Sequence, residues 1–127
     1  MYSEKVKQRF MNPKRRGEVK NPDAKVLVQS EICGDEMEIS FKVKNGKITE
    51  CKFQTFGCAA STATSDMLCE LAEGKTIEEA EHLTREDVIH GLGDLPAVKL
   101  HCSDLATKAL KAAIDQYKKK KWKNKKS

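Results

Sequence analysis

An alternation of apolar and polar residues over 36–44 constrains the fold of this chain more than any other feature. The apolar positions are Met37, Ile39, Phe41 and Val43, and charged residues or a serine separate them. Because successive side chains of a strand point to opposite faces, this pattern predicts a strand with one apolar face and one solvent-exposed face. Asn45-Gly46 favours a tight hairpin turn, so residues 48–55 are predicted to form the return strand. A shorter strand is predicted at 26–30.

The second half of the chain carries helix signals. One helix is predicted over 57–71, stopping before Gly74; two short helices begin at Thr76 and Thr84; a loop over 91–101 leads to a last helix capped by Ser103. Thr76 and Glu79 have the spacing of a capping box. A short N-terminal helix is predicted at 3–10. We therefore expect an α+β domain, with a small antiparallel sheet of about three strands packed against several helices.

Charge is distributed unevenly along the chain. Residues 118–127 hold seven of the 24 basic residues and no acid, so 1–117 carries 17 basic against 19 acidic residues, or about −2. We expect a single domain at 1–117 and a Lys-rich tail at 118–127 that is disordered or a frayed helix end. No apolar run suits a membrane span or a secretory signal, and a reducing cytoplasmic location is expected. A tail-driven nucleic-acid-binding module is one possible function, although nucleic acid is not the favoured partner.

Five cysteines cannot all pair internally, and three of them lie where the chain changes direction. Cys33 falls between two predicted strands, whereas Cys58 and Cys102 fall at predicted helix starts, where free N–H groups and the helix dipole stabilise a thiolate. On spacing alone, a shared metal or sulfur site and three separate cysteines both remain open. Cys51, on a strand beside Phe53, and Cys69, within a helix, are interpreted as buried small hydrophobes.

The chain contains no Cys-x-x-C pair, which argues against a zinc ribbon or a thioredoxin-type centre. No nucleotide fingerprint or nucleophile–base pattern appears either. The sequence therefore does not predict an enzyme.

Several segments, in order, resemble the IscU/NifU-type iron–sulfur scaffold family. They are YSEKV at 2–6, ICGDEM at 32–37, FQTFGCAASTATS at 53–65, GKT at 74–76 and LPAVKLHCSDLA at 95–106. The resemblance runs through residues 2–117. It implies assembly of a transient [2Fe–2S] cluster from iron and sulfur, and zinc can occupy the same site.

The resemblance also assigns roles to the site residues. Cys33, Cys58 and Cys102 match the family's three ligand cysteines, and Asp35 matches an aspartate that affects cluster lability. His101 matches an alternative ligand; a purely structural hydrogen bond is the other interpretation of this histidine. Three thiolates with a weak fourth ligand hold a cluster less firmly than four thiolates, so a recipient's thiolate can displace the scaffold.

The partners implied by the resemblance are a cysteine desulfurase, which supplies sulfur, and apo iron–sulfur proteins, which receive the cluster. An apolar N-terminal face of Tyr2, Val6 and Phe10 suits desulfurase docking, or else packs the helix onto the body. An alternative function with the same cysteines is a zinc-binding persulfide acceptor that modulates the desulfurase. The sequence leaves open whether the chain forms a homo-oligomer.

One motif departs from the family pattern. Its bacterial members carry LPPVK as a docking site for a specialised Hsp70 chaperone, and the corresponding residues here are Leu95, Pro96, Ala97, Val98 and Lys99. Alanine in place of the second proline leaves the loop less fixed. An Hsp70-type partner is therefore left open.

Overall fold

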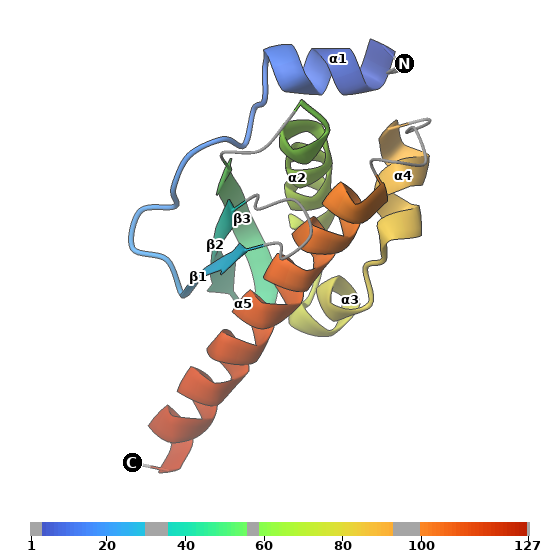
Figure 1. Ribbon diagram of the computed structural model, residues 1–127. Helices are drawn as coiled ribbons and strands as arrows, with labels where there is room; N and C mark the ends of the chain where they lie inside the picture. The colour runs from blue at the N-terminus through green and yellow to red at the C-terminus, as the bar shows by residue number, and fades with distance from the viewer. Residues whose placement is uncertain (1–3, 30–35, 56–58, 93–99, 127) are drawn as a thin grey trace.

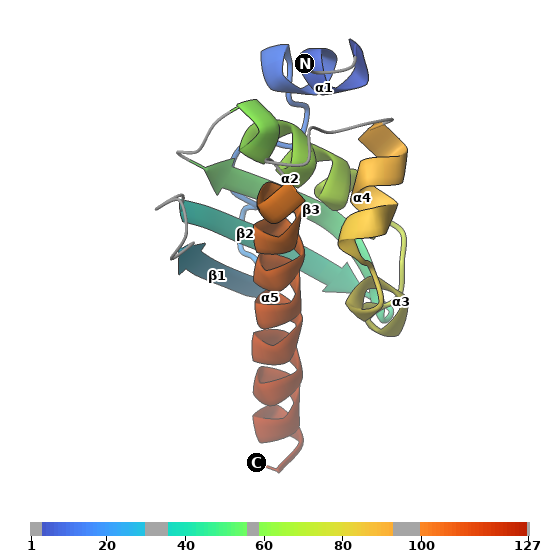
Figure 2. The same cartoon turned by 45° about the vertical axis from the view of Figure 1, so that its right-hand side comes forward.

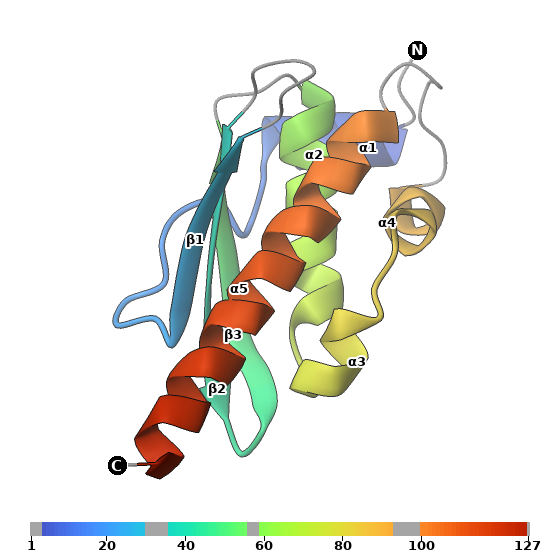
Figure 3. The same cartoon turned by 60° about the horizontal axis from the view of Figure 1, so that its bottom comes forward.

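The computed structural model describes residues 4–29, 36–55, 59–92 and 100–126; for residues 5, 6, 59, 60, 100–104 and 120–126 it describes the backbone alone. In chain order the elements are α1 (Glu4–Met11), β1 (Ala24–Gln29), β2 (Glu36–Lys44), β3 (Lys47–Thr55), α2 (Ala59–Ala72), α3 (Ile77–Glu81), α4 (Arg85–Leu92) and α5 (Leu100–Lys126). The strands form one antiparallel sheet in the order β1-β2-β3, and α2 and α5 cover one of its faces (Figures 1 and 3). The predicted α+β architecture is confirmed.

The hairpin between β2 and β3 follows the sequence pattern closely. Asn45 and Gly46 both have positive φ, 55° and 78°, which a two-residue turn of the type favoured by Asn-Gly requires. Met37, Ile39 and Phe41 point into the core and are fully buried. Val43, beyond a register shift between Lys42 and Val43, is only partly buried.

The opposite face of the sheet is less exposed to solvent than predicted. The N–H of Gly17 donates to the carbonyl of Phe53 at 2.7 Å, and the N–H of Phe53 donates to the carbonyl of Arg15 at 3.0 Å, so this segment runs along the free edge of β3. The N–H of Val19 donates to the Ser40 hydroxyl at 3.0 Å, and both residues are buried. The stretch 14–23, whose basic residues, glycine and proline are typical of a loop, therefore covers part of the sheet.

The capping box at Thr76 is present as predicted. The Thr76 hydroxyl accepts from the N–H of Glu79 at 3.1 Å, and the Glu79 carboxylate accepts from the N–H of Thr76 at 3.0 Å. Gly74, with φ of 87°, follows α2 as predicted for a helix end. Thr84 and Asp87 form a similar reciprocal pair at the start of α4.

The last helix differs from the prediction at both ends. It begins at Leu100 rather than after Ser103, because nothing in Leu100-His101-Cys102 breaks a helix, so Ser103 lies inside α5 and does not cap it. The helix also continues beyond Tyr117 to Lys126 and extends past the sheet (Figure 2), as the helix propensity of lysine allows. The division into a domain and a tail at 117/118 stays a prediction. Within the described part of the chain, no helix combines the length and apolar character needed to cross a bilayer.

Candidate functional site

The segments that carry Cys33 and Cys58 leave the sheet at the same end. Gln29 and Glu36 are register partners on β1 and β2, and they flank the segment 30–35. Met37 and Thr55 are register partners on β2 and β3, and Thr55 directly precedes the segment 56–58. The end of β1, the start of β2 and the end of β3, which flank these two segments, therefore lie side by side.

A side-chain hydrogen bond fixes this end of the sheet. The Thr55 hydroxyl donates to the carbonyl of Glu36 at 2.7 Å, which joins the residue after the first segment to the residue before the second. Thr55 is buried, which limits competition from water for this bond. Sequence reasoning missed this contact, because a threonine at a strand end carries no local sign of its partner.

The helices α2 and α5 begin at this end as well (Figure 3). Cys58 directly precedes Ala59, the first residue of α2, and the backbone of Cys102 lies in the first turn of α5, not before it as predicted. The first-turn N–H groups of a helix lack intrahelical acceptors, so they can stabilise an anion. Two helix starts thus supply positive electrostatic potential to the same end of the sheet.

The predicted ligand side chains themselves lie outside the described part of the molecule. Cys33, Asp35 and Cys58 fall in segments 30–35 and 56–58, and His101 and Cys102 are described in backbone only. Among the side chains that are described, no group of three or more His, Cys, Asp or Glu could hold a metal ion. The ligand set therefore stays a prediction.

Residues 61–66 of α2 are unusually polar for a buried part of a helix. Its buried polar residues are Ser61, Thr62, Thr64, Ser65 and Asp66. The Ser65 hydroxyl donates to the carbonyl of Ser61 at 2.6 Å and contacts Sδ of Met37 at 3.2 Å. These contacts satisfy the hydroxyl and connect the middle of α2 to β2.

An ion-pair network joins α1 and the following segment to α2. Arg9 bridges Asp66 and Glu70, with Nη1–Oδ2 and Nη2–Oε2 distances of 2.8 and 2.7 Å. The N–H of Arg15 donates to Oδ1 of Asp66 at 2.9 Å, and its guanidinium donates to Glu73 at 2.9 Å. Burial acts to lower the pKa of Arg15, but the hydrogen bond and charge of Glu73 outweigh it, and the pKa is raised. The spacing of 66, 70 and 73 on one helix face was the signal available in the sequence.

Most of the predicted partner surfaces fall outside the described side chains. Tyr2, the side chain of Val6 and the whole of 95–99 are among these. Phe10 is described, and 48% of it is exposed. A cavity of about 780 Å³ lies between α1, α2 and α4, and its lining includes Met11, Met67 and Leu71.

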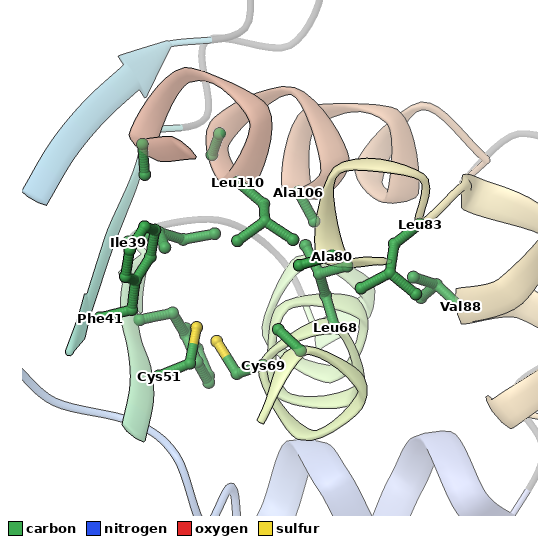
Figure 4. Close-up of a cluster of buried hydrophobic side chains, with 14 of the residues drawn as sticks. Ile39, Phe41, Cys51, Leu68, Cys69, Ala80, Leu83, Val88, Ala106 and Leu110 are labelled. Atoms are coloured by element: carbon green, nitrogen blue, oxygen red, sulfur yellow. The ribbon is translucent and has the colours of Figure 1, made fainter. Parts of the chain in front are cut away.

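Cys51 and Cys69 are fully buried in the core between β3 and α2, as predicted (Figure 4). Cys51 is the register partner of Phe41. Neither residue lies at the end of the sheet described above. Their position is that of core residues.

The sequence matches the family described as the NifU-like N terminal domain over residues 1–124. A relative from Archaeoglobus fulgidus, "Iron-sulfur cluster assembly scaffold protein IscU 1", is 51% identical over 117 residues, covering 92% of this chain and 76% of that protein. The "Iron-sulfur cluster assembly scaffold protein IscU" of Escherichia coli is 40% identical over 124 residues, covering 94% and 96%. A Drosophila melanogaster relative at 43% identity, covering 97% of this chain and 82% of its own length, is named an "assembly enzyme".

Solved structures share the fold. The N-terminal NifU-like protein of Brucella abortus superposes with a TM-score of 0.77 at 20% identity, covering 93% of this chain and 94% of that one. A structure described as a putative iron–sulfur cluster assembly scaffold protein for the SUF system, from Fervidobacterium islandicum, has a TM-score of 0.72 at 26% identity, covering 89% and 96%.

Proposed function

This chain belongs to the family of NifU-like N-terminal domains and is an iron–sulfur cluster assembly scaffold, and we propose that it builds a labile [2Fe–2S] cluster on Cys33, Cys58 and Cys102. The observation that carries the ligand assignment is the arrangement at one end of the sheet. The described residues next to Cys33 and Cys58 meet there, and α5, which bears Cys102, begins there. Segments far apart in sequence thus have neighbouring anchor points.

The electrostatics of this end favour thiolates over thiols. Helix starts stabilise negative charge, and the thiolate is the form of cysteine that binds iron. Three thiolates with a [2Fe–2S] unit of two ferric ions leave a net charge of −1, which two helix N-termini can offset. Asp35 or His101 would complete the site weakly, because a carboxylate or imidazole is a poorer ligand than a thiolate for this chemistry.

The chain acts in this proposal as a carrier without turnover of its own. Sulfur arrives from a cysteine desulfurase and the cluster leaves to recipient apoproteins by exchange of thiolate ligands. A reducing, cytoplasmic setting keeps the cysteines available. The half-exposed Phe10 supports a desulfurase-docking face that it shares with Tyr2 and Val6, and residues 95–99 are a second candidate partner segment.

The domain division also belongs to this proposal. Residues 1–117 provide the scaffold, and the basic residues 118–127 extend it without supplying a ligand. Lys118 pairs with Glu81 of α3 at 2.5 Å, so the base of this extension contacts the domain.

Anaerobic reconstitution with ferrous iron and sulfide tests the function directly. The scaffold should gain visible absorption from thiolate-to-iron charge transfer and bind iron and sulfide in equal amounts. The alternative, a zinc-binding persulfide acceptor, would remain colourless, hold zinc and gain sulfur only on a cysteine. A colourless product without sulfide after reconstitution of folded protein would rule out the cluster proposal.

A further inference from the structure

Two thiols that the proposed scaffold site does not use face each other in the core. Cys51 comes from β3 and Cys69 from α2, and their sulfur atoms point toward one another (Figure 4). The Cys51 thiol is a neighbour of the Cys69 thiol and influences its pKa. Both residues are fully buried, and both are free cysteines.

The surroundings hold the two thiols in this position. The N–H of Cys51 donates to Oε2 of Glu73 at 3.2 Å, and Glu73 is itself held by Arg15. The buried side chains of Phe41, Phe53 and Leu68 belong to the same apolar cluster. A packed interior holds both side chains in this facing arrangement, and such an arrangement is required for joining the two sulfurs.

We propose that Cys51 and Cys69 form a redox modification site, a dithiol that a peroxide converts into a disulfide linking β3 to α2. One sulfur attacks hydrogen peroxide, whose O–O bond breaks, and the products are a sulfenic acid and water. The second thiol then attacks the sulfenic sulfur, forming the S–S bond and releasing a second water. The two sulfurs lose two electrons in total, and the peroxide gains them.

The environment makes this site slow to react. Burial, and then the neighbouring Cys51 thiol, raises the pKa of the Cys69 thiol well above its ordinary value, and a thiol is a much poorer nucleophile than a thiolate. The dithiol therefore remains reduced while exposed cysteines react. It closes under sustained peroxide, because peroxide is small and neutral enough to enter during local opening of the core.

The disulfide would lie close in sequence to the proposed ligand Cys58. β3 ends at Thr55 and α2 begins at Ala59, so a bond from Cys51 to Cys69 closes a loop that contains Cys58. Cross-linking restricts the unfolded chain and stabilises the fold. Formation of this disulfide does not require a bound cluster.

The test uses the full chain with Cys33→Ser, Cys58→Ser and Cys102→Ser, which leaves only the two core thiols. After peroxide treatment of the folded protein, mass spectrometry should show the loss of two hydrogen atoms, and peptide mapping should find Cys51 joined to Cys69. Dithiothreitol should reverse the change, and the Tm should rise by roughly 5–10 °C in the oxidised form. Adding Cys51→Ala or Cys69→Ala should abolish all of these changes.

A second measurement covers the case in which the triple variant does not fold. The unsubstituted chain is alkylated in its native state to block exposed thiols, then treated with peroxide, unfolded and mapped for the same linked peptide. Thiols that stay reduced in the folded chain but oxidise in urea would overturn the proposal. Intermolecular dimers in place of the internal bond would overturn it equally.

Discussion

Nη1 of Arg9 in α1 lies 2.8 Å from Oδ2 of Asp66 in α2, whose side chain is only 2% exposed. Asp66 therefore depends on Arg9 and on the N–H of Arg15 for the interactions that water would otherwise give it. Because α2 follows Cys58 directly in the sequence, this pair connects the N-terminal helix to the helix nearest a proposed ligand.

Replacing Arg9 should destabilise the fold more than its partial exposure suggests. Arg9→Met keeps the aliphatic stem but removes the charge, so the buried Asp66 carboxylate loses its cation; the free energy of unfolding should fall by about 1.5–3 kcal/mol. Urea denaturation followed by circular dichroism measures this. Lys7→Ala, in the same helix but in an exposed pair with Glu4, is the control and should cost at most about 0.5 kcal/mol.

A double-mutant cycle separates the pair from other effects of Arg9. Arg9→Met combined with Asp66→Asn should be less destabilising than the sum of the two single changes, since the second removes the charge that the first leaves unpaired. Additive losses would mean that the two side chains act independently.

The pKa of Cys69 predicts a loss of stability in alkali. Burial raises this pKa well above 9.0, so as pH rises through about 9 the unfolded chain releases this proton while the folded chain keeps it. The unfolded state then binds fewer protons than the folded state. The free energy of unfolding therefore falls by up to about 1.4 kcal/mol per pH unit above pH 9, whereas below about pH 8 Cys69 does not change its dependence on pH. Urea titrations from pH 7 to 10.5 should show a shallower alkaline decline for Cys69→Ala than for the parent. Equal slopes would contradict the shift.

Local sequence signals predicted the elements whose determinants are local. The alternation around Ile39, the Asn45-Gly46 turn and the Thr76 capping box each depend on residues a few positions apart, and all appear as expected. The pairing of Arg15 and Gly17 with Phe53 was missed, because its partners are far apart in sequence and a basic, Gly-containing stretch resembles a loop. Ser103 is predicted to be a cap because serine is a good capping residue, but α5 begins earlier, at Leu100.

The cysteines divide in the same way. Burial of Cys51 and Cys69 could be predicted from their positions in an alternating strand and a helix. That the two sulfurs face each other could not, since it depends on how α2 is rotated against β3. Grouping Cys33 with Cys58 and Cys102 required the family resemblance, because spacing alone left separate cysteines open.

The proposed desulfurase-docking face of Tyr2, Val6 and Phe10 should affect partner binding rather than stability. Phe10→Ala should weaken desulfurase binding roughly 5- to 30-fold, the effect of losing one apolar anchor, with little change in cluster lifetime. Leu27→Ala is the matched control, because Leu27 is also exposed and apolar but lies on β1. Calorimetric titration measures both affinities. An unchanged affinity for Phe10→Ala would remove Phe10 from the docking surface.

The ligand assignment predicts a division among the five cysteines. Cys33→Ser, Cys58→Ser and Cys102→Ser should each reduce bound iron and sulfide by at least about 10-fold, since a lost ligand costs no less than a lost supporting residue. Cys51→Ala and Cys69→Ala should bind close to the parent amounts, with losses confined to stability. Iron and sulfide counting after anaerobic reconstitution gives the answer. Loss of the cluster in folded Cys69→Ala would show that the division is wrong.

The last prediction concerns release of the cluster. Asp35 follows Cys33 by two residues, so its carboxylate can reach the same site and either occupy an iron position weakly or hold water and protons near the bridging sulfides. If such a contact is worth roughly 1 kcal/mol in the release step, removing it changes the rate about 5-fold. Asp35→Ala should therefore assemble a cluster that lasts longer in air and transfers more slowly to an apo-ferredoxin, as followed by visible absorption. Asp35→Asn distinguishes this role from simple turn capping, because asparagine caps a turn as aspartate does but lacks the charge. A charge-dependent role makes Asn behave like Ala, whereas a cluster that decays and transfers at the parent rate in Asp35→Asn would leave the carboxylate with no part in release.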